Sequence, residues 1–393
     1  MLRLTWIPVT EIVLLFAAPS AVSSQQKEHY PPIHPSTYSI IQQTDDLRQE
    51  RKFPQASKLI SAYLKSHPNS SDAFAAFARV QRDLGDTAGS EHSLNYALAI
   101  SPGSVVANLD LGNFLLAEQR YEEALTRFEA VLASDVRNLH ARSGELSAAT
   151  NLALQIRAHG DQEGSLAVLE RARRSLPDDP VLLTNIGIQA ELVHHLHEAA
   201  DALKEAFRIA PGDPKVLYAL ARVETDLDQL PLSEKHLRAY LTARPDDASA
   251  HYGLGRVLHM QQHNDVATME LECSIALQPV QTESYYLLGQ IALDEDQSEK
   301  AKALFLKTLS RESNHGGSLT GMGILMYREK NYEKAAEYLS EAIVSSPEYQ
   351  PAHYYYGLTL GRLGKKDESN AELKRALDLV YEQQRKDKPI TNQ

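Results

Sequence analysis

The sequence is poor in cysteine and tryptophan, with one of each among its 393 residues. The single thiol, Cys273, cannot form an intrachain disulfide or an all-cysteine zinc site, so the fold must depend on packing. The chain also lacks basic residues in excess, because 52 acidic and 40 basic residues give a net charge of −12. Nucleic acid and anionic membranes bind basic surfaces, so this charge argues against both as the main partner. The hydrophobic share of 43% is sufficient for a sizeable core.

Motifs of catalysis and metal binding are missing as well. The chain has no phosphate-binding glycine loop, no nucleophile elbow and no zinc-protease signature. His194, His195 and His197 are close in sequence, but no cysteine or carboxylate arrangement completes a metal site. Acidic pairs that include Asp179 and Asp247 lie near expected helix starts, where they cap helices. We therefore expect no enzyme activity, no metal and no cofactor.

The first 24 residues have the features of a secretory signal peptide. Arg3 gives a positive start, residues 12–18 form an apolar run, and small residues end at Ser24. Pro8 and Glu11 interrupt the apolar stretch, which is far too short to span a bilayer. The sequence predicts export to the periplasm or the outside and no integral membrane span. A cytoplasmic protein is the alternative.

Prolines, glycines and alanines recur with one period. Seven of the prolines are 34, 75, 34, 34, 34 and 68 residues apart, and six of the glycines are 75, 68, 34, 34 and 34 residues apart. Each interval is 34 or twice 34, except that 75 exceeds twice 34 by seven. Three residue types thus indicate one 34-residue repeat with a single seven-residue insertion. The recurring residues are Pro68, Pro102, Pro177, Pro211, Pro245, Pro279 and Pro347; Gly112, Gly187, Gly255, Gly289, Gly323 and Gly357; and Ala124, Ala199, Ala267, Ala301 and Ala335.

A 34-residue unit with Gly at position 8, Ala at 20, an apolar residue at 24 and Pro at 32 resembles the tetratricopeptide repeat. The clearest copy, residues 350–383, has Gly357 in the first helix, Gly364 at the turn and Leu373 in the second helix. The resemblance implies an all-α fold, a right-handed α-solenoid superhelix of stacked helix-turn-helix units. The units are 37–70, 71–104, 105–138, 139–179, 180–213, 214–247, 248–281, 282–315, 316–349 and 350–383. Position 24 is apolar in all ten: Ile60, Leu94, Phe128, Leu169, Leu203, Leu237, Leu271, Phe305, Leu339 and Leu373.

The array of about ten repeats is expected over residues 37–383. A proline-rich linker, residues 25–36, precedes it, and a polar tail, residues 384–393, follows it. The long repeat, 139–179, holds its insertion in the first helix, between Leu139 and Ala158. Seven residues are about two helical turns, so the apolar face stays nearly in phase. We interpret the insertion as neutral, with a protruding landing surface as the alternative.

In the resembled family the first helix of each unit faces a concave groove, which its positions 2, 5, 9, 12 and 13 line. The resemblance therefore places in the groove the tyrosines at position 5 and the Arg or Gln at position 9. Rings offer contact area at low entropic cost, and Arg grips carboxylates or carbonyls, so this strip would suit an extended peptide. Packing is the alternative role for the tyrosines. The candidates are Tyr218, Arg222, Tyr252, Arg256, Tyr286, Gln290, Tyr354 and the neighbouring Tyr355.

Some relatives bind a C-terminal carboxylate through Lys, Asn and Arg residues in three successive units. Here Arg79 and Asn113 occur singly, with Ala75 and Leu109 at position 5 of those units, so this activity is not expected. The leading hypothesis is a non-catalytic scaffold or adaptor that binds protein or peptide partners in an extracytoplasmic assembly. The alternatives are a carbohydrate-binding periplasmic module and a regulatory or targeting subunit of an enzyme complex. The sequence leaves the oligomeric state open.

Overall fold

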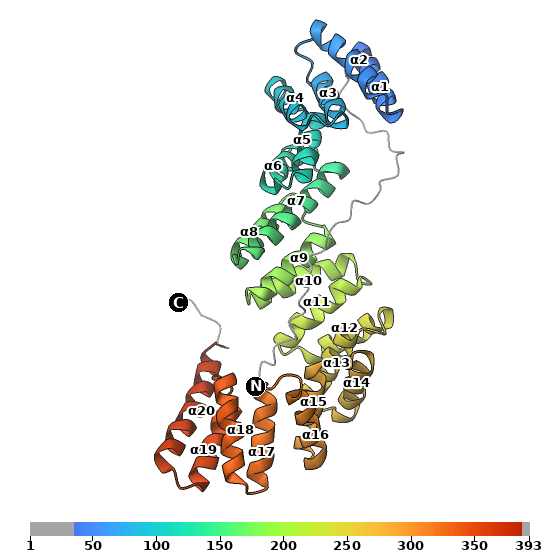
Figure 1. The fold of residues 1–393 in the computed structure, drawn as a ribbon. Coiled ribbons are helices and arrows are strands. Elements are labelled where there is room, and N and C mark those ends of the chain that lie inside the picture. Colours follow the sequence, from blue (N-terminus) through green and yellow to red (C-terminus); the bar gives the residue numbers. More distant parts are fainter. Residues whose placement is uncertain (1–34, 387–393) are drawn as a thin grey trace, which may run out of the picture. The chain divides into compact units, whose positions relative to one another are not determined.

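The computed structural model describes residues 35–386, and this part of the chain consists of helices joined by short turns (Figure 1). The described residues form twenty helices and no strand. The predicted signal peptide and residues 25–34 of the predicted linker lie outside them. The helices are α1 (Pro35–Gln49), α2 (Phe53–Ser66), α3 (Ser71–Asp83), α4 (Thr87–Ile100), α5 (Val105–Ala117), α6 (Tyr121–Leu132), α7 (Leu139–Ala158), α8 (Gln162–Arg173), α9 (Pro180–Leu192), α10 (Leu196–Ile209), α11 (Pro214–Asp226), α12 (Leu230–Ala243), α13 (Ala248–Met260), α14 (Asn264–Leu277), α15 (Thr282–Asp294), α16 (Ser298–Leu309), α17 (Gly316–Arg328), α18 (Tyr332–Ser345), α19 (Gln350–Arg362) and α20 (Lys366–Lys386).

The helices pack in consecutive pairs, in which an odd-numbered helix packs against the even-numbered helix that follows it, as α3 packs against α4 and α13 against α14. Each pair falls within one predicted 34-residue unit, apart from small shifts at the two ends of the array. Odd-numbered helices also contact the odd-numbered helix of the next pair, as α3 contacts α5 and α15 contacts α17. One pair is too small to bury its own apolar face, so this stacking provides the core. The structure confirms the predicted all-α solenoid of stacked helix pairs.

The chain divides into two compact units, and the boundary falls inside α11. The N-terminal unit ends at Ala219, and the C-terminal unit begins at Leu220. Each unit has its own hydrophobic clusters, one of which includes Ile60 in the N-terminal unit and another Phe305 in the C-terminal unit. Among the described helices, none combines the length and the apolar character that crossing a membrane requires.

The position 24 column lies in the core, with only Leu373 of the last pair half-buried. The glycine at position 8 makes room for this column. A Cβ on Gly187 would lie 2.4 Å from Cγ of Leu203 in the same pair, closer than any real contact. The small residue that the repeat requires therefore accommodates one neighbouring side chain.

Two repeats carry Phe at position 24, and each ring lies between two glycines. A Cβ on Gly112 of α5 would lie 2.8 Å from the Phe128 ring, and a Cβ on Gly144 of α7 only 2.3 Å from it. The larger side chain is thus matched by a second glycine, on the first helix of the following repeat. In the C-terminal unit Phe305, Gly289 and Gly321 repeat this arrangement.

The turn between the two helices of a pair has the same backbone conformation throughout the array. Its residue at position 15 has a positive φ, between 57° and 65° for the seven non-glycine residues and between 81° and 88° for the three glycines. L-residues rarely adopt this left-handed region, because Cβ crowds the backbone there. The residues are Arg51, Gly85, Gln119, Gly160, His194, Asp228, Gln262, Asp296, Lys330 and Gly364.

Helix ends follow the expected signals. Oδ1 of Asp179 accepts hydrogen bonds from the backbone N–H groups of Val181 and Leu182, at 3.0 and 2.9 Å, and Asp247 caps α13 in the same way. The capping role predicted for these carboxylates is confirmed. The second helix of a repeat ends shortly before the proline at position 32, as α10 ends at Ile209 before Pro211.

Helix α7 has 20 residues, whereas α5 and α9 have 13 each. It spans Leu139–Ala158, the segment in which the sequence places the insertion. Two element ends differ from the predicted boundaries. Helix α1 begins at Pro35, inside the predicted linker, because the fixed φ of proline suits the first helical position. Helix α20 continues to Lys386, into the predicted tail, because its last residues are good helix formers.

Candidate functional site

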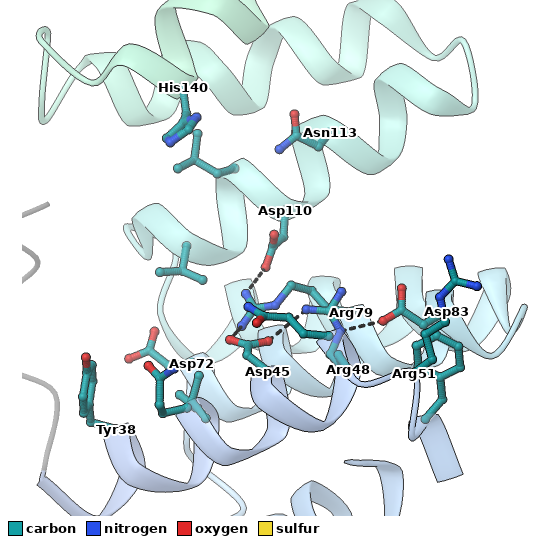
Figure 2. Close-up of a pocket in the computed structure, with 16 residues that line it drawn as sticks. Tyr38, Asp45, Arg48, Arg51, Asp72, Arg79, Asp83, Asp110, Asn113 and His140 are labelled. Carbon is teal, nitrogen blue, oxygen red and sulfur yellow. Dashed lines mark hydrogen bonds and ion pairs between the residues drawn. The ribbon is translucent and has the colours of Figure 1, made fainter. Parts of the chain in front are cut away.

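An open cleft of about 810 Å³ lies in the N-terminal unit (Figure 2). Most of its wall comes from α1, α3 and α5, the first helices of three successive repeats, and His140 is added by α7. The cleft is lined by Tyr38, Ile41, Gln42, Asp45, Arg48, Gln49, Arg51, Phe53, Asp72, Arg79, Asp83, Val106, Leu109, Asp110, Asn113 and His140.

The register of the repeat explains why these side chains meet. Tyr38, Asp72, Val106 and His140 occupy position 2 in four successive units. Position 9 supplies Asp45, Arg79 and Asn113, and positions 12 and 13 supply Arg48, Gln49 and Asp83. Stacked repeats place equivalent positions side by side, so residues about 34 apart in sequence line one surface. These are the positions at which the resemblance places a groove.

A network of ion pairs runs across the floor of the cleft and connects three helices (Figure 2). The guanidinium of Arg48 on α1 donates to Asp83 on α3 at 2.6 Å and to Asp45 on its own helix at 2.9 Å. The guanidinium of Arg79 on α3 donates to Asp45 at 3.2 Å and to Asp110 on α5 at 2.7 Å. Each arginine thus bridges two carboxylates, which fixes the spacing of α1, α3 and α5.

These charges are largely withdrawn from water, since the side chains of Arg79 and Asp110 are both 17% exposed. Burial raises the pKa of Asp110, and the guanidinium of Arg79 only partly offsets this effect. Burial also opposes the charged form of Arg79, but the carboxylates of Asp110 and Asp45 together raise its pKa. The pair of Arg79 and Asp110 is held in a fixed geometry, because separating the two would leave a nearly buried charge without its partner and would lower the stability.

Some of the polar side chains that line the cleft take no part in this network. In the described part of the chain Asp72 has no hydrogen-bonding partner or ion pair, and burial raises the pKa of its carboxyl despite the nearby charge of Arg79. Figure 2 shows Asp72 and Tyr38 on the same side of the network, and Tyr38 is 59% exposed. Asn113 is also exposed at the opposite wall. The cleft therefore offers a ligand the carboxylate of Asp72 and the ring of Tyr38 on one side, and the amide of Asn113 on the opposite wall.

The predicted tyrosine strip is distributed over both units. Tyr218 belongs to the N-terminal unit and is half-buried, whereas Tyr252 and Tyr286 of the C-terminal unit are only 1% exposed. Tyr354 is 43% exposed, and its ring meets the half-buried ring of Tyr355 edge-on at 5.3 Å between centroids. In this structure Tyr354 therefore offers the largest exposed ring of the strip.

Tyr286 is buried because the next repeat leaves room for it. A Cβ on Gly317 of α17 would lie 2.5 Å from Cζ of Tyr286, so the ring lies against the glycine backbone. His315 covers it at 4.7 Å between ring centroids, and Gln290 donates a hydrogen bond of 3.1 Å to its hydroxyl. Burial raises the pKa of Tyr286 well above its usual value. This tyrosine packs two repeats together.

The predicted position 9 residues are also largely covered. Arg222 is 9% exposed and Arg256 is 4% exposed, and a guanidinium nitrogen of Arg256 lies 4.0 Å from Asp226. Gln290 is half-buried beside Tyr286. A partner-binding role for this strip stays a prediction, and a partner would reach most of it only at its edges.

The cleft was not found by sequence reasoning, although its positions were the right ones. The tyrosines at position 5 stand out because one residue type recurs in successive units, whereas the cleft combines Asp, Arg and Asn at position 9. Arg79 and Asn113 were considered only as parts of a carboxylate-binding set. A signal was available for one of these contacts, because the opposite charges of Asp45 and Arg79 at position 9 of successive units predict a cross-repeat ion pair.

Two protein-family models described as tetratricopeptide repeat match the sequence. One matches residues 81–145, and the other matches residues 42–105, 218–271 and 286–353. Together the matches cover more than half of the chain. A comparison with curated proteins gives no match.

Solved structures resemble this fold. A structure of the APC/C heterotetramer Cut9–Hcn1 is 16% identical, with 86% of this chain and 72% of that chain covered and a TM-score of 0.50. The pilus biogenesis factor PilW is 19% identical over 52% of this chain and 94% of its own, with a TM-score of 0.47. MamA from Desulfovibrio magneticus RS-1 is 22% identical over 42% of this chain and 94% of its own, with a TM-score of 0.40.

At such identities the structural likeness concerns the fold alone. The family assignment rests instead on the matched repeat models and on the twenty helices of the described residues, which follow the 34-residue repeat. Proteins with this repeat generally act as protein-interaction scaffolds and are typically non-catalytic. The chain belongs to the tetratricopeptide repeat family.

Proposed function

We propose that this protein is a non-catalytic scaffold that binds an extended segment of a partner protein in the cleft of its N-terminal unit. The observation that carries the proposal is the cleft itself, about 810 Å³ in volume and lined by groove positions of four successive repeats. The rim of the cleft exposes polar groups and the ring of Tyr38, which are group types that protein interfaces use, and the ion pairs hold the floor in a fixed geometry.

The dimensions favour a peptide over a small molecule. Adjacent helices pack about 8–10 Å apart, so four first helices in a row extend over about 24–30 Å. An extended chain advances about 3.3 Å per residue, so a segment of about seven to nine residues would cross them all. Tyr38 and His140 come from the first and last helices that contribute to the cleft, α1 and α7.

A glycan is the weaker candidate. Sugars bind well to exposed aromatic faces, but the rings of Tyr252 and Tyr286 are each only 1% exposed. Tyr38 is the one tyrosine among the residues that line the cleft. The charged floor instead matches the charged side chains and backbone amides of a polypeptide.

We further propose that the scaffold works outside the cytoplasm, in an envelope or secreted assembly. The support is the signal-peptide pattern of residues 1–24, with its positive start, apolar run and small-residue end. N-terminal sequencing of the protein from its host should find a mature chain that starts near Gln25. An intact Met1 in the cytosolic fraction would contradict export and leave the binding proposal unaffected.

Site-specific photo-crosslinking tests the binding proposal. The exposed Asn113 in the cleft is replaced by p-benzoylphenylalanine, and the exposed Asp201 on α10 serves as the matched position outside the cleft. We expect position 113 to cross-link one defined partner in host cells and position 201 not to do so. Mass spectrometry of the cross-link then identifies the partner segment. Equal labelling from both positions, or none from position 113, would contradict binding in the cleft.

A further inference from the structure

We propose that the partner segment presents a basic side chain, Lys or Arg, to the carboxylate of Asp72 and the ring of Tyr38. This inference rests on the proposed function and names the chemistry of the occupant.

The cleft contains more carboxylates than cations. Four aspartates line it, against three arginines, and one of these, Arg51, is exposed at the rim. The interior therefore holds four negative charges, from Asp45, Asp72, Asp83 and Asp110, against the positive charges of Arg48 and Arg79. A cation that enters the cleft lowers this imbalance, and an anion increases it.

The arginines are not available to an incoming anion. Arg48 is held between Asp45 and Asp83, and Arg79 between Asp45 and Asp110, with three of the four contacts at 2.6–2.9 Å. A carboxylate of the partner would have to displace an internal carboxylate from a nearly buried guanidinium. Leaving that carboxylate unpaired is unfavourable, so the network disfavours acidic segments.

Asp72 and Tyr38 are available in a complementary way. The carboxylate of Asp72 makes no hydrogen bond or ion pair among the described residues, and the ring of Tyr38 is 59% exposed on the same side of the network. Burial raises the pKa of Asp72 and of Asp110, which shows that the arginines do not fully offset the cost of burying these carboxylates. A carboxylate and an exposed aromatic ring on one side of the network are the two kinds of group that bind ammonium and guanidinium ions.

Asp72 also lies in the first turn of α3, where a negative charge interacts favourably with the helix dipole. A helix-end role alone predicts that Asp72→Asn lowers the stability of α3 slightly and does not change which peptides bind. The proposed role predicts a change of selectivity in a protein that remains folded. The two roles are therefore separated by comparing probes that differ only in charge.

The test uses the full chain and fluorescein-labelled nonapeptide mixtures with acetylated and amidated ends. The background positions are random mixtures of Ala, Gly, Ser and Thr, and the central position is fixed as Arg, Lys, Gln or Glu. By fluorescence polarisation, we expect the Arg and Lys probes to bind at least about tenfold more tightly than the Gln probe, and the Glu probe most weakly. Asp72→Asn should remove about tenfold of this preference, and Tyr38→Leu a smaller part.

The matched control is Asp201→Asn, which removes one exposed carboxylate from α10 in the same unit and should leave the preference unchanged. Circular dichroism spectra of all variants confirm that they are folded. Free L-arginine amide is included as a competitor, and it should bind far more weakly than the peptides. Equally tight binding of this small cation would overturn the assignment to a protein segment.

Failure of this inference and failure of the proposed function give different results. If the Gln or Glu probe binds as well as the Arg probe, or if Asp72→Asn and Asp201→Asn act alike, the basic side chain is refuted and peptide binding stands. If no probe binds, the partner segment that cross-links to position 113 is used to test the inference. A segment that contains Lys or Arg, and whose cross-link is lost in the Asp72→Asn variant, supports the inference. A segment that contains neither residue refutes it. The absence of both binding and cross-linking refutes the proposed function and this inference together.

Discussion

Replacing Gly144 by alanine tests whether the ring of Phe128 sets the spacing between two repeats. Gly144 lies on α7 and Phe128 on α6, in the preceding pair, and the ring is fully buried. A Cβ at position 144 would lie 2.3 Å from Cε1 of the ring, where an ordinary contact needs at least 3.4 Å. The ring has little room to move toward α5, because its atoms lie so close to Gly112 that a Cβ there would be only 2.8 Å away.

Two opposing effects give the magnitude. Alanine in a helix interior is favoured over glycine by about 1 kcal/mol. Forcing a methyl group into a filled core costs about 1–3 kcal/mol, and an overlap of this depth lies at the upper end. We therefore expect Gly144→Ala to destabilise the α6–α7 region by about 1–2 kcal/mol. Adding Phe128→Leu should recover at least about 1 kcal/mol relative to additivity, because leucine is the residue that other repeats use at this position.

Native-state hydrogen exchange followed by mass spectrometry is the suitable assay. A repeat array does not unfold in one step, so local free energies from amides in α6 and α7 are more informative than one global value. Gly321→Ala in the C-terminal unit should behave in the same way, since its Cβ would lie 2.4 Å from the ring of Phe305. Gly212→Ala is the control, because nothing lies within 4 Å of a Cβ there.

The reasoning is refuted if Gly144→Ala is as stable as the wild type or more stable. Helix propensity would then dominate, and the ring would have room to move. It is also refuted if Phe128→Leu and Gly144→Ala act additively, because the two side chains would then not compete for the same space.

Three further predictions concern charged groups. Arg79→Met should destabilise α1–α5 by about 2–3 kcal/mol at pH 7, because Asp110 loses the cation that pairs with it. The destabilisation should be smaller at pH 4, where carboxylates protonate. A loss of hydrogen-exchange protection that is the same at both pH values would contradict this. Burial raises the pKa of Glu145 to about 7, above the unfolded value, so its contribution to stability falls as the pH rises from about 4.5 to 7, by up to about 3 kcal/mol. Glu145→Gln should remove that part of the pH dependence in urea unfolding, and parallel profiles of the two proteins would disprove it. The ring of His353 contacts Glu372 at 2.6 Å and a backbone carbonyl of the preceding turn at 2.9 Å, so His353→Leu should cost about 1–3 kcal/mol in α19 and α20. Unchanged exchange protection in these two helices would count against this role.

The sequence predicted the repeat because its signal is a set of local size constraints. Glycine at position 8 must admit the side chain at position 24 of the same pair, as Gly187 admits Leu203, so both columns are visible in one chain. Proline marks the end of second helices for a backbone reason that needs no tertiary context. Helix α7 could be located because seven residues were added without loss of the apolar phase.

Contacts between repeats were harder to predict. The match of Phe128 with Gly144 depends on two repeat positions whose residues vary from unit to unit. The contact between them becomes apparent only when neighbouring repeats are stacked. The left-handed turn residue at position 15 was missed for another reason. Residues as different as Arg51, Asp296 and Lys330 occupy it, so no residue type reveals the conformation.

The candidate site shows the same limit. Tyrosines repeated at position 5 indicated an accessible strip, but the exposure of Tyr286 is decided by Gly317 in the next repeat, which lets the ring lie against the backbone. The cleft depends on side chains at different positions of four units, and Arg79 meets Asp45 and Asp110 only after α1, α3 and α5 stack. The repeat positions that line the groove could be predicted from the family resemblance. Which residues at those positions are exposed could not be predicted from the sequence.

The recurring left-handed residue in each helix-to-helix turn makes the array adjustable one repeat at a time. Seven of these residues are not glycine, and each holds a conformation that costs an L-residue about 1 kcal/mol. Repeats with Gly85, Gly160 or Gly364 are already free of this cost. Glycine introduced at Gln119 or Lys330 would relax one turn without changing a core or cleft residue. The local free energy of unfolding can therefore be changed one repeat at a time through this turn residue. Substitutions there, natural or engineered, can determine which repeat unfolds first.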